Sequence, residues 1–286
     1  EMCIRDSTCT AEGLEAVYRG LDNTDRCTVV RLSGPVQKLD ETCLELSLQL
    51  EPRRPRRLCL VLDFHPDGSR QPPPEAAFDA ALEAAVERFR EANRLAASVS
   101  SDNPAFNAWI ARSTSDVHLL TSQLDQGLYP YAGVPWFSCP FGRDGLITAR
   151  QLLLFEPRLA RGVLGFLAEH QARHRDPASD AEPGKVLHEA RLGEMAALGE
   201  VPFAQYYGSV DATPLFLILA GDYLMRSGDQ AFIRDLQDPL DAAMDWIRNA
   251  EARSPDGFLR YQCAAQGGLR NQGWKDSDDA VHHADG

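Results

Sequence analysis

The sequence lacks the features that mark several large classes of protein. No apolar run in its 286 residues approaches the roughly 18–20 residues that a membrane-spanning helix requires. Basic residues are outnumbered, with 29 Lys and Arg against 42 Asp and Glu and a net charge of -13. Such a surface repels phosphate backbones and anionic lipids, so neither nucleic acid nor a membrane is expected as a partner. Phosphate loops, dinucleotide fingerprints and the G-x-S-x-G nucleophile motif are also absent.

The patterns of cysteine and histidine exclude further classes. The seven cysteines are irregularly spaced without a C-x-x-C pair, which argues against a disulfide framework or zinc knuckle and favours the reducing cytoplasm. His282 and His283 follow a polar run that begins at Asp276, but Ala280 and Val281 break the spacing of a calcium loop. Because adjacent histidines rarely face one ion, we expect no metal, and we expect no cofactor either.

Two patterns of hydrophobicity divide the chain into a sheet region and a helical region. Residues 27–65 contain stretches in which apolar and polar residues alternate, as in strands that bury one face of a sheet. The basic cluster at 53–57 is interpreted as a solvated hairpin turn rather than a binding patch. Three prolines at 72–74 interrupt regular structure, and an apolar stripe with helical spacing follows at 78–89. From residue 102 onward the predicted helices begin near residues 103, 144, 157, 188, 213 and 230, with no convincing strand.

Four segments between the predicted helices combine aromatic residues, glycine and charged groups. They are residues 135–145, 183–195, 206–213 and 271–278. Loops on a rigid helical scaffold often carry function. Aromatic rings lie against the apolar face of a pyranose, while carboxylates and guanidinium groups bind its hydroxyls. The composition of these segments therefore favours a carbohydrate site.

The same four segments resemble the amylo-α-1,6-glucosidase (glycogen-debranching) family of glycoside hydrolases, which is related to mannosylglycerate hydrolases, trehalases and glucoamylases. The resemblance covers residues 100–286 and, more weakly, 20–95. It implies a mainly α protein with an N-terminal β part, a truncated β-sandwich followed by an incomplete (α/α)6 toroid. The predicted domains are a partial β-sandwich at 1–70, a linker helix at 71–100 and the N-terminal half of the barrel at 101–286. The chain is accordingly expected to be a fragment.

The resemblance also implies roles for individual residues. Asp276 matches the general acid that protonates the glycosidic oxygen. Arg143 and Asp144 match a pair that binds the hydroxyls of the non-reducing sugar, and Trp136 and Trp274 match aromatic walls of the sugar site. Further residues expected to contribute to the same pocket are Lys185, His188, Glu189, Arg191, Glu194, Tyr207, Asp211 and Lys275.

Most of these residues also have a purely structural interpretation. Asp144 in the first turn of a helix would serve as an ordinary carboxylate at a helix N-terminus. Arg191 and Glu194 have the spacing of a salt bridge on a short helix. Asp211 would equally well cap the helix that begins near residue 213, and Asp276 alone would lie in a solvated turn. The joint occurrence of four motifs favours the functional interpretation of Arg143 and Asp144.

The mechanism implied by the resemblance is inversion, which needs two carboxyl groups. Asp276 can act as the acid if a wall such as Trp274 excludes water from it, whereas the ammonium of Lys275 would oppose protonation. The base is a glutamate expected beyond Gly286, so the fragment itself is expected to have at best trace activity. The expected substrate is an α-glucan or oligosaccharide. A small glycoside (trehalose, glucosylglycerate or mannosylglycerate) and non-catalytic sugar binding remain alternatives.

Overall fold

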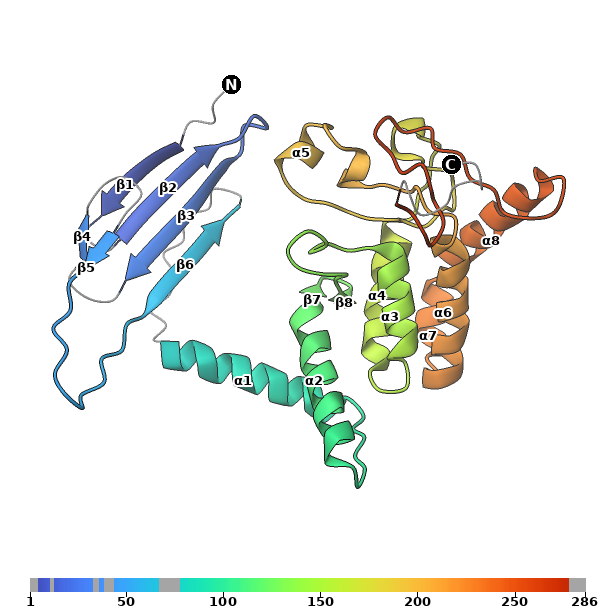
Figure 1. Cartoon of the computed structure of the whole chain (residues 1–286). Helices are drawn as coiled ribbons and strands as arrows, with labels where there is room; N and C mark the ends of the chain where they lie inside the picture. Colours follow the sequence, from blue (N-terminus) through green and yellow to red (C-terminus); the bar gives the residue numbers. More distant parts are fainter. Residues whose placement is uncertain (1–4, 11–12, 33–35, 39–43, 67–77, 278–286) are drawn as a thin grey trace, which may run out of the picture. The chain divides into compact units, whose positions relative to one another are not determined.

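The computed structural model describes residues 5–10, 13–32, 36–38, 44–66 and 78–277. The chain divides into two compact units, Glu1–Arg88 and Phe89–Gly286. An antiparallel sheet in the first unit is followed by helices, so the fold is mixed α/β (Figure 1). Within the described ranges, no helix combines the length and the apolar character needed to cross a bilayer.

The first unit contains a four-stranded antiparallel sheet and a separate strand pair. The strands of the sheet lie in the order β1 (Arg5–Thr10), β2 (Gly13–Arg19), β3 (Asp25–Leu32) and β6 (Leu60–His65), and β4 (Val36–Lys38) pairs with β5 (Leu44–Leu46). The prediction of strands within 27–65 is confirmed. The prediction of a hairpin at 53–57 is wrong, because β5 and β6 on either side of it pair with β4 and β3 instead of with each other.

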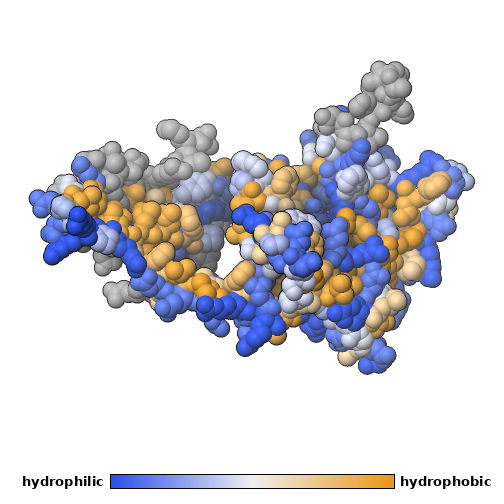
Figure 2. Space-filling view, turned by 60° about the horizontal axis from the view of Figure 1, so that its bottom comes forward, coloured by the Kyte–Doolittle hydropathy of each residue, from blue (hydrophilic) through white to orange (hydrophobic). Residues whose placement is uncertain are grey.

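The helix α1 (Phe78–Leu95) contains the apolar stripe that predicted it. The stripe is not buried among the described residues, since Phe78 is 55% and Leu82 is 49% exposed. Apolar side chains are also exposed on β6 at Leu60 and Phe64, and Figure 2 shows apolar surface gathered over the sheet unit. The periodicity of these segments therefore identifies their secondary structure correctly without identifying a buried core.

The second unit has its core between four helices. They are α3 (Gly142–Gln151), α4 (Pro157–Glu169), α6 (Ala212–Ser227) and α8 (Gln237–Ala252), and α6 packs against the other three. The largest fully buried aliphatic and phenyl side chains of this core are Leu146, Leu159, Leu164, Leu167, Leu187, Phe216 and Leu219. Each such side chain contributes about 1.5–3 kcal/mol on burial, so the core holds these helices in fixed positions.

The predicted ends of two helices are confirmed. The helix α2 (Pro104–Leu120) is capped at its N-terminus by Asn103, whose Oδ1 accepts hydrogen bonds from the amides of the second and third residues after it, at 2.9 and 3.2 Å. This side chain satisfies amides that have no partner within the helix. At its C-terminus, α6 stops at Gly228, which has a left-handed φ of 69°. Glycine adopts this conformation without strain, so it ends the helix.

Other predictions for this unit are wrong in detail. The strands β7 (Thr121–Leu124) and β8 (Gly127–Pro130) form a hairpin where no strand was expected, because four-residue strands are too short for their alternation to be recognised. The expected long helix at 230–253 is divided into α7 (Gln230–Asp235) and α8, since Pro239 lacks an amide hydrogen and is tolerated only in the first turn of a helix. The remaining short helices are η1 (Pro177–Ser179), α5 (Glu194–Ala197) and η2 (Pro202–Ala204).

The β7–β8 hairpin packs against α4 through two glycines. Gly127, at the start of β8, has a φ of 131°, which side-chain-bearing residues rarely adopt. A Cβ atom added to Gly127 would lie 3.1 Å from the Cα of Gly162 in α4. A Cβ atom added to Gly162 would lie only 2.2 Å from the carbonyl oxygen of Leu128. The two main chains are therefore in direct contact.

Replacing Gly162 with alanine is expected to lower the free energy of unfolding by about 2–3 kcal/mol, because the new methyl group meets main-chain atoms that cannot rotate away. The matched control is Gly221→Ala in α6, where an added Cβ would meet nothing within 4 Å. That control is expected to be neutral or to stabilise the helix by up to about 1 kcal/mol. Urea unfolding of both variants measures the difference, and equal stability of the two would contradict the contact.

Candidate functional site

Arg143 connects three segments that are far apart in the sequence. It lies in the first turn of α3 and is only 8% exposed. Its Nη1 donates to the carbonyl oxygen of Gly273 at 2.8 Å and to Oδ2 of Asp211 at 3.3 Å. Its Nη2 donates to Oδ2 of Asp276 at 2.5 Å. We call Arg143, Asp211 and Asp276 the Arg143 cluster. The planar fork of a guanidinium suits such a convergence of acceptors.

Main-chain hydrogen bonds hold the start of α3 in place. The amide of Gly142 donates to the carbonyl of His188 at 2.7 Å. Isolated β-bridges join Phe141 to Glu189 and Glu189 to Tyr206, so three of the four sequence segments meet in one short ladder. The hydroxyl of Tyr129 donates to the carbonyl of Phe141 at 2.8 Å. The two residues that precede Arg143 are thus held by main-chain bonds to residues 188 and 189, and these bonds determine where Arg143 lies.

Asp211 precedes α6, but its side chain makes no capping hydrogen bond to the helix. Ser209 does so instead, since its Oγ accepts from the amide of Ala212 at 3.2 Å. The same hydroxyl donates to Oδ1 of Asp211 at 2.6 Å. Asp211 is therefore oriented by Ser209 on one oxygen and by Arg143 on the other.

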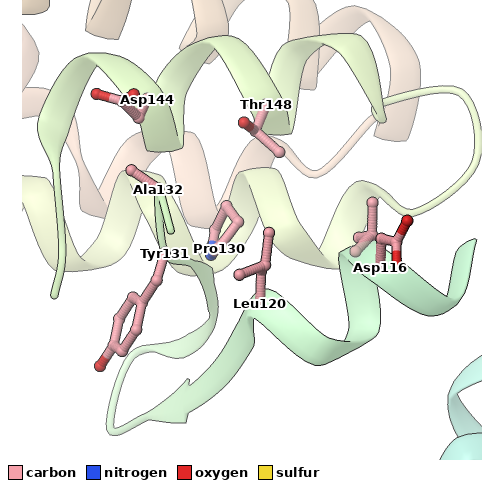
Figure 3. Close-up of a pocket in the computed structure, with 8 residues that line it drawn as sticks. Asp116, Leu120, Pro130, Tyr131, Ala132, Asp144 and Thr148 are labelled. Atoms are coloured by element: carbon pink, nitrogen blue, oxygen red, sulfur yellow. The ribbon is translucent and has the colours of Figure 1, made fainter. Parts of the chain in front are cut away.

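Asp144 places a third carboxyl group near the Arg143 cluster. Burial raises the pKa of this group, the guanidinium of Arg143 lowers it, and the carboxylates of Asp276 and Asp211 raise it further. Asp144 also lines a hollow of about 200 Å³ between α2, α3 and the segment after β8, shown in Figure 3. The other residues that line this hollow are Asp116, Val117, Leu120, Pro130, Tyr131, Ala132 and Thr148.

A second ion pair connects Trp136 to this region. Glu189 is 3% exposed, and its Oε2 lies 2.7 Å from Nε of Arg191. Burial raises the pKa of Glu189, its ion pair and hydrogen bond with Arg191 lower it, and Asp276 and Asp144 raise it. Nη1 of Arg191 donates to the carbonyl oxygen of Trp136 at 3.0 Å. Glu189 is thus a buried carboxyl group within electrostatic range of the Arg143 cluster.

The two tryptophans of the predicted sugar walls are exposed. Trp136 is 76% exposed and Trp274 is 72% exposed. Trp274 lines an open hollow together with Lys275, Asp276 and Ser277. The side chain of Asp276 is 33% exposed, so water reaches it from this hollow. Trp274 and Asp276 therefore line the same hollow, so one ligand can contact both the indole ring and the carboxyl group.

His188 is buried without a hydrogen-bond partner for its Nδ1 within the part of the chain that the structure describes. Its ring packs edge-to-face against Phe141 and Tyr206, at centroid distances of 5.7 and 5.9 Å. Burial, together with the nearby charge of Arg143, lowers the pKa of His188 from 6.5 to about 4. His188 is therefore a neutral imidazole near pH 7.

This pKa predicts a loss of stability in acid. Between about pH 6.5 and 4 the unfolded chain takes up a proton on His188 that the folded chain does not, so stability falls as the pH falls. The expected loss is about 2 kcal/mol between about pH 6.5 and 4.5. His188→Gln should remove this part of the slope in urea unfolding, while His174→Gln, at an exposed histidine, should retain it. Identical slopes for all three proteins would contradict the prediction. Burial raises the pKa values of Asp144 and Glu189, so these two groups contribute stability that increases as the pH falls. Their contribution is expected to be the same in the wild type and in both variants.

Three other predicted residues make contacts elsewhere or lie at helix starts. Nζ of Lys185 donates to the carbonyl oxygen of Asp180 at 3.2 Å and lies 5.8 Å from the ring centroid of Trp246. The hydroxyl of Tyr207 donates to the carbonyl of His170 at 2.7 Å. Glu194 begins α5. The convergence on Arg143 thus involves Asp144, Asp211 and Asp276, and the neighbouring ladder adds His188, Glu189 and Arg191.

Sequence reasoning missed several residues that build this site. The carbonyl of Gly273 has no sequence signature, because any residue offers one. Ser209, two positions before Asp211, is a recognisable capping residue ahead of a helix. Asp180 and Gln272 are buried at 6% and 1% exposure, and only their burial distinguishes them from ordinary loop residues.

Across the described residues, no group of three or more His, Cys, Asp or Glu side chains is arranged to hold a metal ion. The polar residues at 278–283, considered above for a metal, lie outside the described residues. Neither the family models nor the curated proteins compared with this chain gave a match, so its function is inferred from the geometry of the Arg143 cluster.

Proposed function

We propose that the chain belongs to a glycoside hydrolase of the amylo-α-1,6-glucosidase type, which hydrolyses α-glucosidic linkages in an α-glucan or oligosaccharide with inversion. The observation that carries this proposal is the convergence of carboxylates on one buried arginine. Arg143 binds Asp211 and Asp276, which lie 68 and 133 residues further along the chain. A surface salt bridge would not require a guanidinium that is 8% exposed and shared between two loops.

The chemistry of the cluster suits a sugar ring. The side chains of Asp211 and Asp276 are 24% and 33% exposed, so each can accept hydrogen bonds from hydroxyl groups while Arg143 holds it in place. Asp144 adds a carboxyl group whose pKa is raised by burial. Trp274 offers an exposed ring beside Asp276 for the apolar face of the sugar.

In this proposal Asp276 is the general acid. Its Oδ2 faces Arg143, so the proton for the glycosidic oxygen is carried on Oδ1. A sugar that fills the hollow beside Trp274 displaces water from the carboxyl group of Asp276. Inversion also needs a base on the other side of the sugar, roughly 6.5–9.5 Å from the acid, to activate water.

The proposal extends to the architecture. We propose that α2 to α8 belong to an (α/α)6 toroid and that the N-terminal sheet belongs to a β-sandwich. The packing of α6 against α3, α4 and α8 supports the first part, and the antiparallel order β1-β2-β3-β6 supports the second. The irregular spacing of the seven cysteines, without a C-x-x-C pair, supports the proposed cytoplasmic location.

The proposal is tested by sugar binding and by the stereochemistry of the product. Binding of 1-deoxynojirimycin, a glucose-shaped cation, is measured by calorimetry. Hydrolysis of isomaltotriose is followed by proton NMR for the 286-residue chain and for a form extended past Gly286. We expect both forms to bind this compound, and the extended form to release β-glucose early in the reaction. Turnover of trehalose or glucosylglycerate instead would favour the small-glycoside alternative, and binding without turnover of any substrate would favour a sugar-binding protein. Absence of binding and turnover in both forms would refute the proposal.

A further inference from the structure

Asp180 is a buried carboxylate that gathers four hydrogen-bond donors. It is 6% exposed and has a left-handed φ of 54°. Its Oδ1 accepts from the amides of Ala264 and Ala265, at 2.7 and 3.1 Å. Its Oδ2 accepts from the hydroxyl of Tyr206 at 2.8 Å and from Nε2 of Gln272 at 3.0 Å. A buried carboxylate is tolerated only with such a set of donors, so this arrangement is a built feature of the fold.

The two side chains that bind Oδ2 extend the network. Tyr206 is fully buried, and its hydroxyl accepts a hydrogen bond from the amide of Leu269 at 2.8 Å. Gln272 is 1% exposed, and its main-chain carbonyl accepts from the amide of Val210 at 2.8 Å. Asp180 is therefore connected, directly or through one residue, to positions 264, 265, 269 and 272.

These positions lie in the segment that follows α8. Residues 254–277 contain no helix or strand, so their path depends on bonds to the rest of the unit. The residue after Gln272 is Gly273, whose carbonyl binds Arg143, and Trp274 and Asp276 follow. The network around Asp180 thus ends immediately before the residues that reach the Arg143 cluster.

Lys185 belongs to the same network. Its Nζ donates to the carbonyl oxygen of Asp180 at 3.2 Å. Burial lowers the pKa of Lys185, while the charges of Glu182 and Asp180 raise it. The sequence predicts Lys185 in the sugar pocket, and its contact with Asp180 places it in the network as well.

We propose that Asp180 is a positioning residue, which through Tyr206 and Gln272 fixes residues 264–277 so that Asp276 meets Arg143. The inference rests on the proposed function only for the purpose of the positioning, which is to build a sugar site. The attachment of the segment to Asp180 can be tested without any sugar.

The first test is amide hydrogen exchange of peptides from 261–277 in three proteins. Tyr206→Phe removes the hydroxyl that joins Asp180 to Leu269, and exchange of this segment is expected to become about tenfold faster. The matched control is Tyr223→Phe, because the hydroxyl of Tyr223 also binds an aspartate, Asp229, at 3.0 Å, but six residues away on the neighbouring turn. Exchange in 261–277 that is unchanged, or changed equally by the control, overturns the attachment.

Two substitutions at Asp180 are expected to increase the hydrogen exchange of residues 261–277 to different extents. Asp180→Asn keeps one oxygen for the amides of Ala264 and Ala265 but replaces the other acceptor by an amide donor. Asp180→Ala removes both acceptors. Exchange of 261–277 should therefore increase from the wild type to the asparagine variant and again to the alanine variant. Equal exchange in the two variants would contradict a role for both oxygens.

The second test separates positioning from stability. Binding of 1-deoxynojirimycin is measured well below the unfolding transition, where every variant remains folded. Tyr206→Phe is expected to weaken binding about tenfold, and Tyr223→Phe to change it less than about twofold even if it destabilises the fold as much. Faster exchange in Tyr206→Phe with unchanged sugar affinity would refute positioning of the sugar site. Absence of sugar binding and of turnover in both forms of the wild type would refute the proposed function, and with it the purpose of the positioning, while the exchange experiment would still decide the attachment.

Discussion

Replacing Asp276 with asparagine is expected to slow hydrolysis of an α-1,6-linked glucoside about a thousandfold, because the N–H protons of an amide are too weakly acidic to be transferred to the leaving oxygen. The amide oxygen can still accept from Arg143, so the variant should retain its fold. The rate is measured on whichever form, the 286-residue chain or the extended one, hydrolyses isomaltotriose. Asp222→Asn is the control, since Asp222 forms an exposed ion pair with Arg150 at 2.6 Å and is expected to leave the rate unchanged.

A second substrate makes this test specific for acid catalysis. An aryl glucoside with a weakly basic leaving group, such as a dinitrophenyl glucoside, needs little protonation as it departs. Asp276→Asn should therefore slow its cleavage far less than that of isomaltotriose. An equal loss on both substrates would assign Asp276 to binding only. Glu189, a buried carboxyl group whose pKa is raised by burial, would then be the next candidate for the acid.

Arg143→Met is expected to lower the free energy of unfolding by about 3 kcal/mol, because it leaves Asp211 and Asp276 beside Asp144 without their cation. The estimate lies at the lower end for a broken buried pair, since the two carboxylates are 24% and 33% exposed and water can solvate them in part. Affinity for maltose, a neutral sugar, should fall at least about a hundredfold, since both carboxylates lose their orientation. Urea unfolding and calorimetry measure the two effects.

The control for Arg143→Met lies on the same helix. Arg150 in α3 pairs with Asp222, and both side chains are well exposed, at 52% and 36%. Arg150→Met should cost about 0.5 kcal/mol and leave sugar binding unchanged. A loss that matches the control would show that Arg143 does not neutralise these groups.

Local signals in the sequence predict the parts of the fold that local chemistry determines. Asn103 followed by a proline predicts the start of α2, and Gly228 predicts the end of α6, because each effect involves only neighbouring residues. The β7–β8 hairpin was missed since its strands are held by packing against α4 rather than by their own alternation. The exposed stripe of α1 shows the converse, that periodicity identifies a helix without identifying what covers it.

The candidate site divides in a similar way. Arg143, Asp144 and Asp276 stand in motifs of unusual composition, so residue type alone draws attention to them. Asp180 stands in an ordinary loop sequence, and its importance follows from four donors contributed by positions 26 to 92 residues away. Partners at such separations cannot be inferred from one sequence, because nothing local records them.

The contact between Gly127 and Gly162 also limits how this fold can diverge. Each glycine makes room for the main chain of the other, so a side chain at either position forces the hairpin away from α4. A larger residue at one position cannot be compensated by a smaller residue at the other, because glycine already lacks a side chain. In homologous chains that keep this hairpin, both positions should be glycine, and chains that have lost one should carry a different loop there.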